Sequence, residues 1–136
     1  MSTYLDSNVL IYAVEGRGGL AAEAIVRLTD PPDPSSPLVV SHLVRLECIV
    51  APLARQNAGL LAEYKALLDS GRLEVIGIGG EAFDLAAAIR ARYGFRTPDA
   101  LHLAAAVTHG CAVFLTADRD LGRCEEIGVE VLGGQA

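Results

Sequence analysis

The sequence predicts an α/β protein in three layers, α/β/α, with a mainly parallel five-stranded sheet in the middle. Short apolar runs alternate along the chain with longer segments whose apolar residues recur at helical spacing. Several of the short runs are apolar without interruption, which is typical of strands covered on both faces. Right-handed crossovers between parallel strands then place helices on both sides of the sheet.

The first strand and the first helix are predicted at the beginning of the chain. The run at residues 3–5 is too short for a helix and ends at a carboxylate, so we expect a strand there. A helix is expected from Val9, with Ser7 or Asn8 as its N-cap. Glycines then break the chain before a second helix, predicted over residues 20–29 by the spacing of its apolar side chains.

The next segment contains two strands and two helices. Residues 30–37 hold four prolines and predict a loop, and the β-branched run at 38–40 predicts a strand. Ser41 is expected to cap a helix that Pro52 ends or kinks. Apolar residues at helical spacing predict another helix over 60–68, before a strand at 73–78.

The last part repeats the same alternation. A helix is predicted up to Tyr93, where Gly94 stops it, and Thr97 followed by Pro98 is typical of the start of another helix. The remaining elements are a helix to His109, strands at 112–115 and 129–132, and a short helix starting at Asp118.

Composition limits the class of protein. The chain has 136 residues, of which 51% are hydrophobic, and its mean hydropathy is +0.36. We expect one domain over residues 1–136, in the cytoplasm and not in a membrane, because no run is long enough to span a bilayer and no signal peptide is visible. Three cysteines without metal-ligand spacing predict buried, reduced thiols.

Glu47 is the most informative acidic residue. Its neighbours one helical turn away are Leu43, Val44, Val50 and Ala51, so we expect it in the middle of the stripe that faces the core. An ionised carboxylate there is costly unless it is paired or bound to a cation. A structural ion pair with an arginine is the alternative. If Glu47 binds a cation, Glu47→Gln is expected to leave the metal-free protein at least as stable.

Three further acids lie at places where strands end or helices begin. Asp6 and Asp118 each follow a predicted strand, and Asp99 opens a helix. Each alone is explained equally well by helix capping or by the helix dipole. Because parallel strands all end at one edge of the sheet, we expect these acids and Glu47 to converge there. Repulsion among them would favour a hard cation such as Mg²⁺ or Mn²⁺.

The sequence around these acids resembles the PIN-domain nucleases, most closely the VapC-like toxin ribonucleases. The resemblance rests on LDSNVLIY around Asp6, on Glu47, on TPDALHLAAA around Asp99 and on FLTADRDL around Asp118, in family order over nearly the whole chain. It implies a Mg²⁺- or Mn²⁺-dependent endoribonuclease that a cognate antitoxin silences. The four acids would be the catalytic metal ligands.

The resemblance also implies a supporting set. Asn8 and Thr116 occupy its small polar positions, Asp120 competes with Asp118 for the fourth acidic position, and Ser7 stands where threonine is more usual.

The net charge of −6 argues against a nucleic-acid-binding protein, because phosphate contacts need Lys and Arg. Four acids committed to a metal site account for most of that excess. Arg90, Arg92 and Arg96 precede Asp99 and are candidates for contacting RNA, although a solvated helix face explains them as well. We assign no role in catalysis to His102, and expect it to be a packed or surface residue.

Partners are predicted from the apolar surplus and from the resemblance. We expect a homodimer and a complex with an antitoxin, and the stripe on the helix at 60–68 is either the surface used or ordinary core. Two alternatives stay open: a PIN-like domain that binds RNA or protein without catalysis, and a Mg²⁺-dependent phosphotransfer domain. A receiver domain would need paired acids and a lysine near the site, but Asp6 stands alone and the single lysine, Lys65, lies mid-helix.

Overall fold

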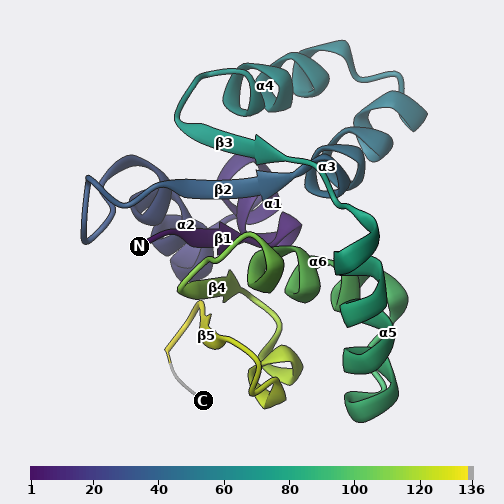
Figure 1. Ribbon diagram of the computed structural model, residues 1–136. Coiled ribbons are helices and arrows are strands. Elements are labelled where there is room, and N and C mark those ends of the chain that lie inside the picture. The colour runs from purple at the N-terminus through teal and green to yellow at the C-terminus, as the bar shows by residue number, and fades with distance from the viewer. Residues whose placement is uncertain (135–136) are drawn as a thin grey trace.

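A computed structural model describes residues 1–134 and contains one sheet of five strands in the order β3-β2-β1-β4-β5 (Figure 1). Every neighbouring pair of strands is parallel, which confirms the predicted sheet. The central register pairs Tyr4 with Val39 on one side and with Phe114 on the other. The strands are β1 (Thr3–Leu5), β2 (Leu38–Ser41), β3 (Leu73–Ile76), β4 (Val113–Thr116) and β5 (Gly128–Val131).

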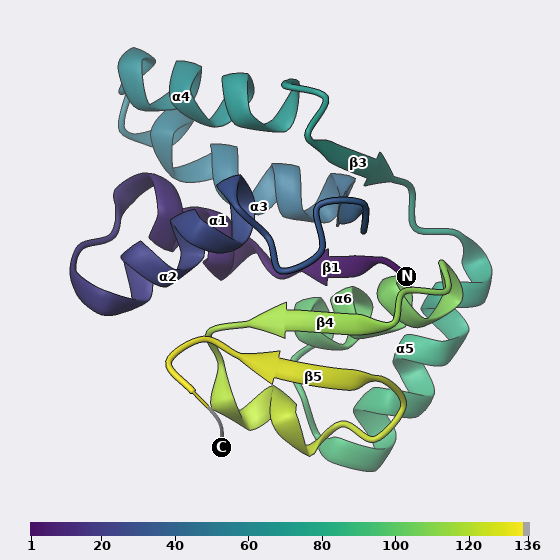
Figure 2. The same cartoon turned by 90° about the vertical axis from the view of Figure 1, so that its left-hand side faces the viewer.

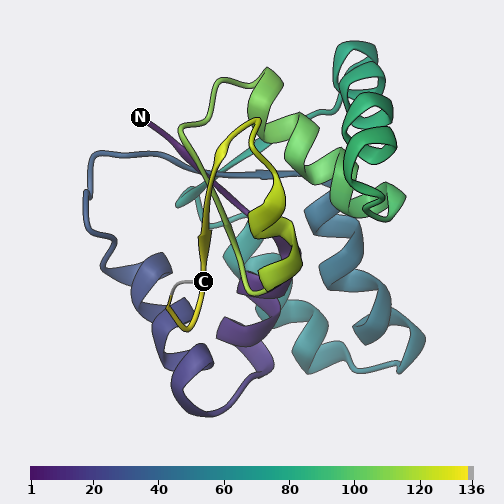
Figure 3. The same ribbon diagram turned by 90° about the horizontal axis from the view of Figure 1, so that it is seen from below.

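Helices cover both faces of this sheet and complete the three predicted layers. They are α1 (Ser7–Glu15), α2 (Gly18–Thr29), α3 (His42–Ala54), α4 (Ala58–Leu68), α5 (Gly80–Tyr93) and α6 (Thr97–Thr108), with the 3₁₀ helix η1 (Arg119–Arg123) before β5. The chain moves from β1 to β3 in one direction and then returns to β4, so right-handed crossovers place α1 to α4 on one face and α5 and α6 on the other. Figures 2 and 3 show these two groups from the side and from below.

At three helix ends the structure differs from the predicted cap or stop signal. Asp6, and not Ser7 or Asn8, is the N-cap of α1, because its carboxylate accepts the backbone N–H of Ser7. Arg96 is the N-cap of α6, and Thr97 already lies in the helix. Helix α3 continues through Pro52 to Ala54, although proline lacks the N–H for the helical hydrogen bond.

The apolar stripe on α4, predicted to be either a partner surface or ordinary core, packs mostly in the core. Tyr64 and Leu68 are buried, and Leu60 and Leu67 pack against the core, so this face of α4 is mostly interior. The large exposed apolar side chains lie elsewhere, with three on α3: Leu46, Val50 and Leu53. All three cysteines are free and buried, as predicted. Within residues 1–134, none of the helices combines the length and the hydropathy needed to cross a membrane.

The strand order creates a switch point between β1 and β4. The chain leaves β1 toward β2, and it returns to the other side of β1 when it forms β4. Loops at the carboxyl ends of such neighbouring strands diverge, and ligands of open α/β sheets bind in the resulting crevice. Asp6 directly follows β1, and Thr116 ends β4, so both lie at this point of the sheet.

Candidate active site

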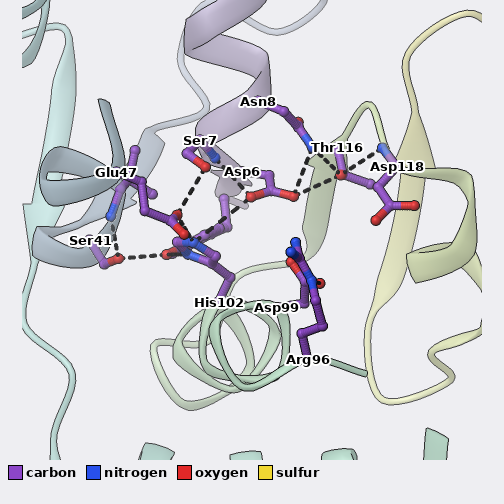
Figure 4. Close-up of polar contacts among 12 residues, drawn as sticks. Asp6, Ser7, Asn8, Ser41, Glu47, Arg96, Asp99, His102, Thr116 and Asp118 are labelled. Atoms are coloured by element: carbon purple, nitrogen blue, oxygen red, sulfur yellow. Dashed lines mark hydrogen bonds and ion pairs between the residues drawn. The ribbon is translucent and has the colours of Figure 1, made fainter. Parts of the chain in front are cut away.

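Asp6 lies at the centre of the polar residues at the switch point (Figure 4). Its side chain is buried, with a relative exposure of the residue of 3%. Oδ1 accepts the backbone N–H of Ser7 at 2.8 Å, and Oδ2 accepts the hydroxyl of Thr116 at 2.8 Å and the amide of Asn8 at 3.2 Å. The helix cap and the site therefore share one carboxylate.

Burial raises the pKa of Asp6 above its ordinary value, because desolvation disfavours the ionised form. Attraction to His102 and the hydrogen bonds from Thr116 and Ser7 act in the opposite direction, and the charge of Asp99 adds to the increase. The ionised carboxylate of Asp6 is thus under-compensated by the side chains around it. A bound cation would supply the missing positive charge.

Asn8 and Thr116 connect the first and fourth strands through Asp6. The Asn8 amide donates to the Thr116 hydroxyl at 3.2 Å, and its carbonyl accepts the backbone N–H of Ala117 at 2.9 Å. The Thr116 oxygen also accepts the backbone N–H of Asp118 at 3.0 Å. This network fixes the loop after β4 relative to Asp6, and both predicted supporting residues contact the carboxylate of Asp6.

Glu47 lies at the edge of the buried face of α3, not in its middle as predicted. Val44 and Cys48 are buried, whereas Val50 is 53% exposed, so the helix is rotated relative to the predicted stripe. The Glu47 side chain is 28% exposed. Its Oε1 accepts the Ser7 hydroxyl at 2.9 Å and contacts Nε2 of His102 at 2.5 Å.

The partner of Glu47 is therefore a histidine and a serine, and neither Arg45 nor Arg55, which pair with Asp69 and Glu15. Burial acts to raise the pKa of Glu47, but the hydrogen bond and attraction from His102 and the hydrogen bond from Ser7 outweigh it, and the pKa lies below its ordinary value. The lowered pKa means that the ionised form of Glu47 is favoured in the metal-free fold, which differs from the premise behind the predicted stability of Glu47→Gln.

The other predicted acids, Asp99, Asp118 and Asp120, are not part of the group of donor atoms that Asp6, Glu47 and His102 bring within 4.8 Å of one another. Asp99, in the first turn of α6, contacts Nε of Arg96 at 3.3 Å and acts electrostatically on Asp6. Asp118 caps η1 and faces the same region as Asp6 and Asp99 in Figure 4. Asp120, the alternative to Asp118, is instead paired with Arg123 at 2.8 Å.

The three arginines predicted to contact RNA, Arg90, Arg92 and Arg96, have different surroundings. The Arg96 side chain is 81% exposed next to Asp99, and its charge contributes to the lowered pKa of Glu47. Arg92 forms ion pairs with Glu125 and Glu126, both at 3.0 Å. Arg90 lines a groove between α5 and α6. Of the three, Arg96 is the one that forms an ion pair with a predicted site acid, Asp99.

Residues 3–127 match the family model described as the PIN domain. The chain belongs to the PIN domain family. No curated protein sequence matches the chain.

Several solved structures share the fold of this PIN domain. A toxin–antitoxin complex from Klebsiella pneumoniae contains a chain with 22% identity and a TM-score of 0.72, and the match covers 93% of this chain and 95% of that one. VapBC-1 from nontypeable Haemophilus influenzae has 20% identity and a TM-score of 0.72, with 98% and 100% covered. The sarcin–ricin loop cleaving toxin VapC20 of Mycobacterium tuberculosis has 16% identity and a TM-score of 0.67, with 83% and 87% covered.

The donor atoms of this PIN domain fit a hard divalent cation. Asp6, Glu47 and His102 each place one donor atom within 4.8 Å of the others, and Asp99 is close enough to raise the pKa of Asp6. Carboxylate oxygens are the ligands that Mg²⁺ and Mn²⁺ prefer. The nitrogen of His102 that faces the group is engaged with Glu47, so the oxygens of the acids are the better candidates for ligands.

Proposed function

We propose that this chain is a Mg²⁺- or Mn²⁺-dependent endoribonuclease and the toxin of a toxin–antitoxin pair. The observation that carries the proposal is the buried, under-compensated carboxylate of Asp6 at the switch point, with Glu47 beside it and Asp99 acting on it. In this proposal Asp6, Glu47, Asp99 and Asp118 hold the cation. When bound, a divalent cation activates water and offsets negative charge on a phosphodiester.

The protein's own groups have separate tasks in this proposal. Thr116 and Asn8 hold the Asp6 carboxylate at the end of β1, and Ser7 holds Glu47. Arg96, exposed at the rim beside Asp99, is placed to bind a phosphate of the RNA backbone. Arg90 and Arg92 remain candidates for more distant backbone contacts, although Arg92 must first leave its ion pairs with Glu125 and Glu126.

The decisive experiment incubates the purified protein with total RNA in Mg²⁺, in Mn²⁺ and in excess chelator, and maps the new ends. We expect cleavage only with a divalent cation, leaving 5′-phosphate and 3′-hydroxyl ends. Asp6→Asn is the inactive control. Cleavage that persists in chelator contradicts the metal requirement, and 2′,3′-cyclic phosphate ends indicate a different chemistry. Absence of cleavage on any RNA favours the non-catalytic alternative.

The proposed protein partner is a small antitoxin. Support comes from the structural neighbours, several of which are toxin–antitoxin complexes, and from the exposed apolar side chains of this chain. Expression together with a candidate small antitoxin, followed by size-exclusion chromatography, tests the partner. A co-eluting complex that suppresses cleavage is expected, and independent elution with unchanged cleavage argues against it. The three reduced thiols agree with a cytoplasmic location for this pair.

A further inference from the structure

His102 is completely enclosed, yet both of its ring nitrogens have polar partners. Its relative exposure is 1%. Nε2 lies 2.5 Å from Oε1 of Glu47, and Nδ1 lies 2.8 Å from the hydroxyl of Tyr4. The Tyr4 hydroxyl continues to Oγ of Ser41 at 2.7 Å. These four side chains, Ser41, Tyr4, His102 and Glu47, form one hydrogen-bonded chain, which we call the buried relay (Figure 4 shows its serine, histidine and glutamate).

The buried relay joins two neighbouring strands to a helix on each face of the sheet. Tyr4 belongs to β1, Ser41 ends β2, Glu47 lies on α3, and His102 lies on α6 at the opposite face of the sheet. Ser41 is also the N-cap of α3, since its Oγ accepts the backbone N–H of Val44 at 3.4 Å. The helix that carries Glu47 is therefore held at its start and at its functional side chain by the same hydrogen-bonded chain.

The direction of the central hydrogen bond follows from the chemistry of its two ends. An ionised carboxylate can only accept, so Nε2 of His102 must donate to Glu47. That nitrogen is 3.9 Å from Oδ1 of Asp6 and points its hydrogen at Glu47, so it has no lone pair to offer a cation. Among the described side chains, both donors to Glu47, Ser7 and His102, contact Oε1, which leaves Oε2 for another ligand.

We propose that His102 is a positioning residue: it holds Oε1 of Glu47 so that Oε2 faces the cation of the proposed site, while Tyr4 and Ser41 fix the imidazole. The inference rests on the proposed function, and it goes beyond it by assigning a role to a residue outside the four acids. Groups that orient a metal-binding carboxylate in this way typically change metal affinity or activity by about 10- to 100-fold when removed.

Two substitutions of His102 separate its two nitrogens. The amide nitrogen of glutamine can reach the place of Nε2, whereas that of asparagine lies near the place of Nδ1. His102→Gln therefore keeps a donor for Glu47, and His102→Asn keeps only the contact with Tyr4. Tyr4→Phe leaves the ring of His102 intact but removes the hydroxyl that fixes it. The matched control is His109→Gln: His109 is the C-cap of α6, at the opposite end of that helix from Asp99, and it pairs with Glu74 at 3.2 Å.

The measurements are Mn²⁺ affinity by electron paramagnetic resonance, RNA cleavage rates, and thermal melting in chelator. We expect His102→Asn to weaken Mn²⁺ binding by about 10- to 100-fold. We expect kcat to fall with little change in KM for RNA. His102→Gln should keep much of the wild-type Mn²⁺ affinity and kcat. Tyr4→Phe should lower both quantities, but by less than His102→Asn does. His109→Gln should match the wild type in both.

The outcomes decide between positioning and packing. If His102→Asn and His102→Gln lose thermal stability equally but keep wild-type Mn²⁺ affinity, His102 is a packing residue and the inference is overturned. If His102→Asn does not fold, Tyr4→Phe takes its place in the test. Wild-type Mn²⁺ affinity in Tyr4→Phe then also overturns the inference. A wild-type protein that binds Mn²⁺ but cuts no RNA refutes the proposed function alone, because the Mn²⁺ measurement still tests His102.

Discussion

At the scale of single residues, the carboxylate of Asp6 has conflicting tasks in the fold and in the proposed site. It caps α1, which stabilises the helix, but burial raises its pKa, so its charge is unfavourable in the metal-free protein. We predict that Asp6→Asn reduces metal-dependent cleavage by more than about 100-fold, beyond the usual effect of a group outside the ligand sphere. Asparagine is also a good N-cap, so the fold is expected to persist.

The pH dependence of the stability of Asp6→Asn provides a second test. A carboxyl group with a raised folded-state pKa destabilises the fold only where it is ionised, so the unfavourable charge is absent below the unfolded pKa of about 3.9 and fully present above the folded pKa. In chelator, Asp6→Asn should therefore gain stability relative to the wild type as the pH rises from about 4. Urea unfolding at several pH values measures this. A difference that does not change with pH contradicts the assignment of the raised pKa to Asp6.

Glu47→Gln should behave in the opposite way. The pKa of Glu47 lies below its ordinary value, so its ionised form stabilises the fold above the unfolded pKa of about 4.3, and this contribution is lost as the pH falls through the folded pKa. At neutral pH we expect a loss of roughly 1–2 kcal/mol, in the lower part of the range for hydrogen bonds to charged groups because the side chain is 28% exposed. Chemical denaturation in chelator measures it, and cleavage should fall sharply. A less stable variant with normal cleavage would refute the catalytic role.

The sequence indicated Asp6 and Asp118 because each follows a strand, Asp99 because it opens a helix, and Glu47 because of its apolar helical neighbours. It did not predict the partner of Glu47. The signal for His102 was present, since this histidine lies between Leu101 and Leu103 on an apolar helix, and a buried imidazole needs polar partners. Those partners, Tyr4 and Glu47, are far away in the chain and could be found only from the strand order.

At the scale of elements, the turn between α5 and α6 sets where Arg96 and Asp99 lie. Gly94 ends α5 with φ 76°, in the left-handed region, and a Cβ there would meet no atom within 4 Å. We predict that Gly94→Ala destabilises the protein by about 1–2 kcal/mol through backbone strain alone.

Gly59→Ala on α4 is the matched comparison. Its added Cβ would meet only Oδ1 of Asn57, at 3.8 Å, and its φ is not positive, so it should stabilise the helix by about 0.5–1 kcal/mol. Urea denaturation of both variants checks the opposite signs. Two changes of the same sign would contradict the conformational explanation.

The predicted elements agree with the structure where the period of apolar residues is clear, and they differ at the ends of helices. The continuation of α3 past Pro52 illustrates the reason. Proline removes one helical hydrogen bond, but Pro52 is buried on the same face as Val44 and Cys48, so tertiary packing overrides the local preference. Similarly, the cap of α1 was misplaced because Asp6, Ser7 and Asn8 are all good cap residues.

At the scale of the whole molecule, the exposed apolar surface supports the predicted homodimer. Leu46, Val50 and Leu53 recur at helical spacing on α3 and are 57%, 53% and 54% exposed. We expect light scattering at high micromolar concentration to give the mass of a dimer. Val50→Glu should shift it toward the monomer, because a charge in an apolar interface must be desolvated.

Val26→Glu provides the control for that experiment. Val26 is 50% exposed on α2, so the same substitution introduces the same charge at similar exposure on another helix. We expect this variant to stay dimeric. A wild-type monomer at high micromolar concentration, or equal effects of the two substitutions, would remove α3 as the self-association surface.

The pairing of β1 with β4 also sets when the proposed site is completed during synthesis of the chain. Asp6 is translated before its partner Thr116, which follows only after β2, β3 and the six helices α1 to α6. A nascent chain that stops before β4 has neither Thr116 nor Asp118. The carboxylate of Asp6, which caps α1, then lacks the hydrogen bond that Thr116 donates. If RNA is the substrate, the messenger and the ribosome that make this protein are out of reach of a finished site until β4 and the loop that carries Asp118 have been translated.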